Sequence, residues 1–114
     1  MEDFTQGDLF PLTLNEYQAS AYKTCMPTAY EFDYLITNLA GEAGEVASKY
    51  AKHLRDSTAF PRVEIAKECG DVLWQVAVLA QRMGYTLEEI ARINLRKLQD
   101  RRDRGVLTGQ GDNR

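Results

Sequence analysis

Apolar residues recur every three or four positions along most of the chain, the spacing of one face of an α-helix. The pattern predicts four helices, at about 13–25, 30–55, from Ser57 or Thr58 to 83, and 86–104. Thr13 and Thr86 each stand three residues before a glutamate, which is the pattern of a capping box at the start of a helix. Pro27 and Gly84 are placed to end helices. No segment alternates like a strand, so the sequence predicts an all-α fold.

The third predicted helix is apolar on nearly every side between Val72 and Ala80. Such a helix must be covered all round, which three partner helices in a chain of 114 residues would struggle to do. We therefore expect one domain over residues 1–114, a four-helix bundle completed by homo-oligomerisation as a dimer or a dimer of dimers. The alternative is a tightly wrapped monomer. Residues 105–114 contain three glycines and no periodicity, which predicts a loop or a flexible tail.

Composition and charge narrow the class of protein. With 44% hydrophobic and 27% charged residues, the chain has the composition of an ordinary globular protein. Its net charge of −3 is uneven, because residues 1–33 are acidic and residues 96–114 are basic. This argues against a nucleic-acid partner and fits the binding of one small anion such as a phosphate chain. The sequence predicts a cytoplasmic protein with no membrane partner. Its first residues are acidic, its two cysteines lack the spacing of a disulfide framework or a zinc site, and no apolar run is long enough to span a membrane.

Four carboxylates break the apolar pattern. Glu42 falls within the apolar stripe of the second helix, and Glu45 lies three residues further on. Glu68 and Asp71 repeat this spacing at the edge of the stripe of the third helix. Side by side, these helices would hold four carboxylates in one pocket, where a pair about 4 Å apart repels by roughly 4 kcal/mol. Hard oxygen ligands predict Mg²⁺ or Mn²⁺ there; the alternative is a solvated face on which Glu45 pairs with Lys49.

The fourth predicted helix offers the complementary charge. Asn94, Lys97 and Arg101 lie on one of its faces, at spacings of three and four residues. An acidic metal pocket facing this row would suit a polyphosphate, with metal ions on one side and cationic side chains on the other. The alternative is an amphipathic helix end whose cations stabilise the helix dipole. Lys52, seven residues after Glu45, is either a further phosphate contact or a surface lysine.

The chain resembles the all-α nucleoside triphosphate pyrophosphohydrolases, in their MazG-like branch. The resemblance covers nearly the whole sequence and is centred on residues 39–46, 68–73 and 94–98. The family pattern is Glu-Glu-x-x-Glu followed by Glu-x-x-Asp, and this chain matches it except that Gly41 replaces the first glutamate. The ending, residues 109–114, is also similar to the tail of small stand-alone members.

The resemblance implies a single MazG-like domain that hydrolyses (deoxy)nucleoside triphosphates to the monophosphate and pyrophosphate, as part of nucleotide-pool housecleaning. It also implies dependence on Mg²⁺, for which Mn²⁺ could substitute, and a homodimer or homotetramer. One alternative is a relative of narrow specificity, for dUTP or a phosphoribosyl nucleotide. Another is a non-catalytic helical dimer or antitoxin-like module.

The resemblance also implies roles for individual residues. It assigns metal binding to four carboxylates, Glu42, Glu45, Glu68 and Asp71. Glu42 or Glu45 would be the catalytic proton acceptor, and the choice between them stays open. It assigns substrate binding to five side chains, with Lys52, Lys97 and Arg101 at the phosphates and Gln75 and Asn94 at the sugar or base. Tyr17, Tyr34 or Trp74 could stack on the base, although aromatic residues at helical spacing are more often part of the core.

Overall fold

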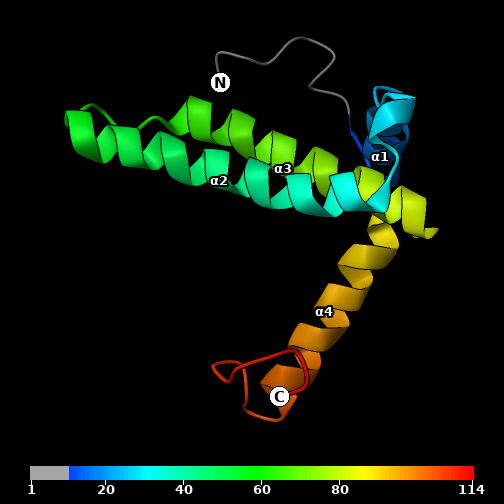
Figure 1. Ribbon diagram of the computed structural model, residues 1–114. Coiled ribbons are helices and arrows are strands. Elements are labelled where there is room, and N and C mark those ends of the chain that lie inside the picture. The colour runs from blue at the N-terminus through cyan, green and yellow to red at the C-terminus, as the bar shows by residue number, and fades with distance from the viewer. Residues whose placement is uncertain (1–10) are drawn as a thin grey trace.

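The computed structural model describes residues 11–114, and their regular structure consists of helices (Figure 1). In chain order the elements are α1 (Leu14–Tyr22), the short 3₁₀-helix η2 (Pro27–Ala29), α2 (Phe32–Asp56), α3 (Arg62–Met83) and α4 (Leu87–Asp103). No strand occurs between residues 11 and 114. The prediction of an all-α fold with four α-helices is confirmed. The observed helix ends lie within three residues of the predicted ones, except that α3 begins at Arg62, after Pro61, and not at the predicted Ser57 or Thr58.

Local sequence explains where the helices begin and end. The hydroxyls of Thr13 and Thr86 accept hydrogen bonds from the backbone N–H groups of Glu16 and Glu89. The carboxylate of Glu89 in turn accepts from the backbone N–H of Thr86, which completes a capping box and holds the pKa of Glu89 below its usual value. At the end of α3, Gly84 has a φ of 84°, a conformation that glycine adopts without strain.

α2 and α3 run antiparallel along most of their length, and we call them the hairpin (Figure 1). α1 packs against the C-terminal part of α3, where the indole N–H of Trp74 donates to the hydroxyl of Thr24 at 2.8 Å. The core lies at this end of the hairpin and is small. It is formed by Cys25, Leu35 and Val78, with partly buried apolar residues packed around them.

Gln18 of α1 joins α1 to the junction between α3 and α4. Its side chain is 3% exposed, and its Nε2 donates to the carbonyl oxygens of Ala77 at 3.1 Å and Tyr85 at 3.0 Å. Its Oε1 accepts from the backbone N–H of Leu87 at 2.8 Å, and the Asn15 carboxamide accepts from the next N–H of α4. These hydrogen bonds give partners to backbone N–H groups in the first turn of α4, and they fix the direction in which α4 extends from α3.

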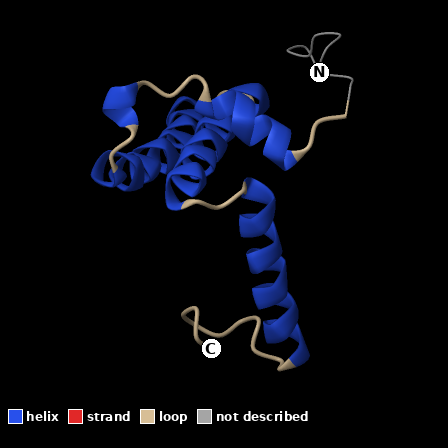
Figure 2. Ribbon diagram, turned by 90° about the vertical axis from the view of Figure 1, so that its right-hand side faces the viewer, coloured by secondary structure: helices blue, strands red, loops and turns tan. Residues whose placement is uncertain are grey.

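α4 leaves the hairpin as an extended arm, which we define as residues 87–114 (Figure 1, Figure 2). It packs against the ends of α1 and α3 and does not lie along α2. The Cα radius of gyration is 16.8 Å, whereas a compact chain of this length would have about 13 Å. A four-helix bundle is therefore not formed within one chain, because the Gln18 hydrogen bonds direct α4 away from the hairpin.

Large apolar side chains remain exposed on both the hairpin and the arm. Leu54 and Phe60 near the hairpin tip are 62% and 57% exposed, and Leu95 on the arm is 65% exposed. The apolar surface of α3 is also only partly covered, since Leu73 is 40% exposed. Exposed apolar surface on this scale is typical of a protein interaction surface.

The tail predicted for residues 105–114 is a loop, but it folds back onto α4 (Figure 2). The Arg101 guanidinium, which is 5% exposed, donates to the carboxylate and the carbonyl of Asp112 at 3.0 and 3.1 Å. Lys97 pairs with the same carboxylate at 3.0 Å, and Arg114 donates to the Val106 carbonyl. Lys97 first and then Arg101 hold the pKa of Asp112 below its usual value. The tail is thus tied to α4 by the ion pairs of Asp112 with Lys97 and Arg101.

Gln18→Leu should lower the free energy of unfolding by about 2–4 kcal/mol, because a buried carbonyl, a part-buried carbonyl and a buried N–H group lose the partner that Gln18 provides. Urea unfolding followed by circular dichroism measures this change. Ser20→Ala, at an exposed position of the same helix, is the control and should change stability by less than about 0.5 kcal/mol. Equal stabilities of the two variants would contradict the role given to Gln18.

Candidate metal centre

Three carboxylates from α2 and α3 meet along the hairpin, and we call them the acidic trio. Glu42, Glu68 and Asp71 each offer one oxygen atom, and these atoms lie within 4.8 Å of one another. Glu42 and Glu68 are half-buried and Asp71 is exposed. The antiparallel packing of the hairpin places the acid of α2 opposite the two of α3, which lie one turn apart. The structure therefore brings together three of the four acids that sequence spacing predicts to meet.

The fourth acid, Glu45, is exposed and lies outside the acidic trio. The ion pair between Glu45 and Lys49 that the alternative interpretation predicts does not form. Lys49 instead reaches across the hairpin to Glu68, at 3.8 Å, with side-chain exposures of 35% and 18%. This pair offsets part of the negative charge, but it leaves three carboxylates close enough to repel one another.

Three polar side chains border the acidic trio. Asn38, one turn before Glu42, donates from Nδ2 to its Oε1 over 3.5 Å. Burial first, and then the negative charge of Asp71, raise the pKa of Tyr17. Gln75, one turn after Asp71, is 3% exposed, and its Oε1 has no hydrogen-bond partner among the described residues. Sequence reasoning missed Asn38, whose position four residues before Glu42 was the available signal.

The substrate-binding residues predicted on α4 do not reach the acids of the same chain. Asn94 is exposed on the arm, and Lys97 is occupied by Asp112. Arg101 lies buried beneath the tail, which makes it a tie between helix and tail instead of an open phosphate contact. The reason is the direction of α4, which is set by Gln18 and which the periodicity of the helix does not specify.

Lys52 is exposed and lies nearer the hairpin tip than the acidic trio. It is ten residues after Glu42, which corresponds to about 15 Å along the helix. There a hydrogen bond from Arg55, and to a lesser extent the charge of Lys52, hold the pKa of Asp56 below its usual value. Within one chain Lys52 therefore has the surroundings of a surface lysine.

Comparison with known proteins places the chain in a family. The MazG nucleotide pyrophosphohydrolase domain matches residues 31–106, a range that includes α2, α3, α4 and the whole acidic trio. The chain belongs to the MazG family. It is also 43% identical over 109 residues to the Gene 37 protein of Mycobacterium phage L5, covering 86% of this chain and 96% of that protein. No solved structure matches the chain.

Membership of the MazG family indicates a nucleotide pyrophosphohydrolase in general terms, and members of the family generally depend on a divalent metal. The acidic trio is the set of side chains in this MazG domain that could hold such an ion. None of the helices between residues 11 and 114 has the length and apolar character that a membrane span requires.

Asp71→Asn should leave the metal-free protein at least as stable as the wild type, within about 1 kcal/mol, because one of three repelling charges is removed. It should also abolish the rise in Tm that we expect Mg²⁺ to produce in the wild type. Thermal unfolding with and without MgCl₂ measures both effects. Glu64→Gln, which removes an exposed acid of α3 outside the acidic trio, should keep the Mg²⁺ response. Unfolding of metal-free Asp71→Asn would show that Asp71 is a structural partner instead.

Proposed function

We propose that this chain hydrolyses a (deoxy)nucleoside triphosphate to the monophosphate and pyrophosphate with Mg²⁺, a reaction suited to nucleotide-pool housecleaning. The observation that supports this most strongly is the acidic trio, formed by two packed helices in a chain of the MazG family. Its donor set fits the ion, because carboxylate oxygens are the ligands that Mg²⁺ and Mn²⁺ prefer. The three carboxylates also repel one another, and a bound cation would offset this repulsion.

In this proposal Glu42, Glu68 and Asp71 hold the metal. The chemistry that a bound divalent cation supplies is neutralisation of the polyphosphate and activation of a water molecule. Glu45 is one turn from Glu42, exposed and outside the acidic trio, so it is the carboxylate we assign to accept the proton of the attacking water. The water oxygen bonds to phosphorus, the bridge between the α- and β-phosphates breaks, and the bridging oxygen leaves with one product.

We also infer that a second copy of the chain completes the site. Each arm carries Asn94 and Lys97 away from the acidic trio of its own hairpin, and both the arm and the hairpin expose apolar side chains. The arm is basic and the trio is acidic, so the two surfaces are complementary in charge. Lys97 is partly exposed, and a triphosphate would compete with the single carboxylate of Asp112 for it. Arg101, which pairs with the same carboxylate, would keep Asp112 when a triphosphate takes its place at Lys97.

Purified protein incubated with each common NTP and dNTP should release monophosphate and pyrophosphate in equal amounts, and only with a divalent metal. Glu42→Gln should lower kcat by more than about 100-fold, because a metal ligand is lost. Chromatography of the products measures both quantities. Activity confined to dUTP or to a phosphoribosyl nucleotide would indicate the relative of narrow specificity. Absence of turnover together with an unchanged Tm in Mg²⁺ would indicate a non-catalytic helical dimer.

A site built from two copies predicts complementation between inactive variants. Glu42→Gln removes a proposed metal ligand from the hairpin, and Lys97→Ala removes a proposed phosphate contact from the arm. When the two variants are refolded together, mixed dimers therefore contain one intact site. At substrate concentrations below KM the mixture should recover about a quarter of wild-type activity. Mixing Glu42→Gln with Asp71→Asn is the control, because both changes lie on the hairpin and no intact site can form. Recovery equal to that control would contradict completion of the site by a second copy.

A further inference from the structure

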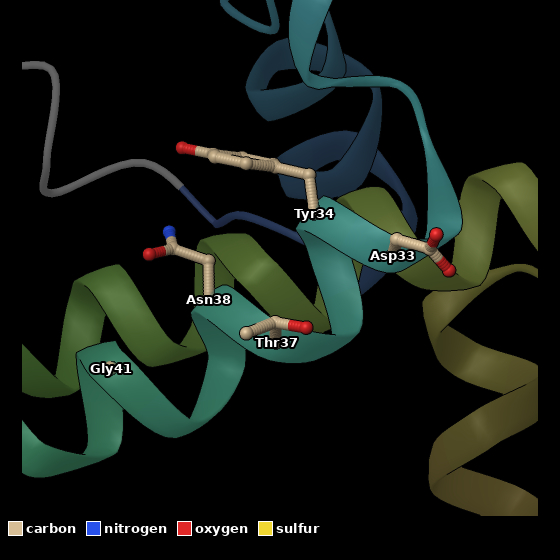
Figure 3. A pocket seen from close by; sticks show the side chains of 5 residues that line it. All are labelled: Asp33, Tyr34, Thr37, Asn38 and Gly41. Carbon is tan, nitrogen blue, oxygen red and sulfur yellow. The ribbon is translucent and has the colours of Figure 1, made fainter.

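A hollow lies beside Glu42, along the first half of α2. Its described lining residues are Asp33, Tyr34, Thr37, Asn38 and Gly41 (Figure 3). The Tyr34 ring and the Asn38 carboxamide project from the same side of the helix, and Gly41 leaves the backbone bare next to them (Figure 3). The hollow has a volume of about 550 Å³, within the range of small-molecule sites.

Helix geometry and one hydrogen bond place the hollow next to Glu42 of the acidic trio. Gly41 lies seven residues after Tyr34, so both stand on nearly the same line along α2, and Asn38 and Glu42 follow at four and eight residues. Asn38 bridges the two regions, since its Nδ2 is 3.5 Å from the Glu42 carboxylate. Eight residues of helix rise about 12 Å. This is comparable to the reach from the base of a nucleotide to the middle of its triphosphate.

The chemistry of the lining suits a heteroaromatic ring and not a phosphate. None of the described lining residues is cationic, and the Asp33 carboxylate at one end would repel an anion. The Tyr34 side chain is 47% exposed, and its ring offers a face on which a base can stack. Asn38 and Thr37 add groups that can both donate and accept hydrogen bonds.

Gly41 keeps this space open. A Cβ atom at this position would be in van der Waals contact with Oδ1 of Asn38, at 3.4 Å, and a larger side chain would extend from there into the hollow. Glycine in the middle of a long helix weakens that helix, which makes its presence here a local cost to the fold. Room for a ligand beside the acidic trio is a physical reason for that cost.

We propose that this hollow binds the nucleoside part of the substrate, with the base stacked on Tyr34 and Gly41 providing the space. The inference rests on the proposed function, because it takes the phosphates to lie at the acidic trio. It makes Tyr34 and Gly41 determinants of affinity for the nucleoside and not for the phosphate chain.

Two ligands separate these contributions: a non-hydrolysable α,β-imido deoxynucleoside triphosphate, and inorganic tripolyphosphate, which has no base. Titration calorimetry in Mg²⁺ gives the Kd of each. Tyr34→Ala should weaken binding of the nucleotide about tenfold and leave tripolyphosphate unchanged. Tyr34→Phe keeps the ring and should bind both ligands like the wild type. Ile36→Ala is the matched control, an exposed apolar residue of the same helix that does not line the hollow.

Gly41→Leu tests the space itself. Leucine favours the helix over glycine, so a loss of nucleotide binding would not reflect unfolding of α2. We expect this variant to lose nucleotide affinity and keep tripolyphosphate affinity. Gly44→Leu makes the same change at a position about 200° around the helix from Glu42, with open space at its Cβ, and should bind both ligands normally.

The outcomes distinguish this inference from the function on which it rests. Equal losses for both ligands in Tyr34→Ala, or no loss, would overturn it. So would a changed oligomeric state of Gly41→Leu without selective loss of nucleotide affinity, which would assign this face to a second copy. A wild-type protein that binds tripolyphosphate as tightly as the nucleotide overturns the nucleoside site alone. A wild type that binds neither ligand in Mg²⁺ contradicts the proposed function, and the nucleoside site with it.

Discussion

Packing of α2 against α3 holds like charges together, and this repulsion is the constraint on which the rest depends. Glu42, Glu68 and Asp71 keep oxygen atoms within 4.8 Å of one another, and Lys49 offsets part of their charge from the Glu68 side. Side chains on an exposed helix face could separate, but two of these three are half-buried between packed helices. A divalent cation bound there would relieve the repulsion that the fold itself creates, and ion binding would then be linked to the stability of the hairpin.

The arm poses a second physical problem, because it carries the basic side chains away from the acids of its own chain. The hydrogen bonds of Gln18 set its direction, and the apolar surfaces of arm and hairpin stay exposed as a result. Both features have one explanation if a second copy packs on this chain. Apolar burial would then supply the association energy, and the same contact would deliver Lys97 to an acidic trio.

Much of this could be predicted from the sequence, and the exceptions share a cause. Helix ends depend on nearby residues such as Thr86 and Gly84, so periodicity and capping predicted all but the start of α3 within three residues. The meeting of the acids follows from two amphipathic helices packed side by side. The direction of α4 does not follow, because Gln18 bonds to groups 59 to 69 residues further along the chain. The burial of Arg101 was missed likewise, since it depends on a tail with no periodicity.

The most direct test of metal binding by the acidic trio is anomalous diffraction from crystals grown with Mn²⁺, which scatters strongly and accepts the same oxygen ligands as Mg²⁺. The expected result is an anomalous peak between α2 and α3, within coordination distance of carboxylate oxygens of Glu42, Glu68 and Asp71. A peak elsewhere, or no peak with the three carboxylates separated and individually solvated, would contradict the proposed metal centre and the activity inferred from it.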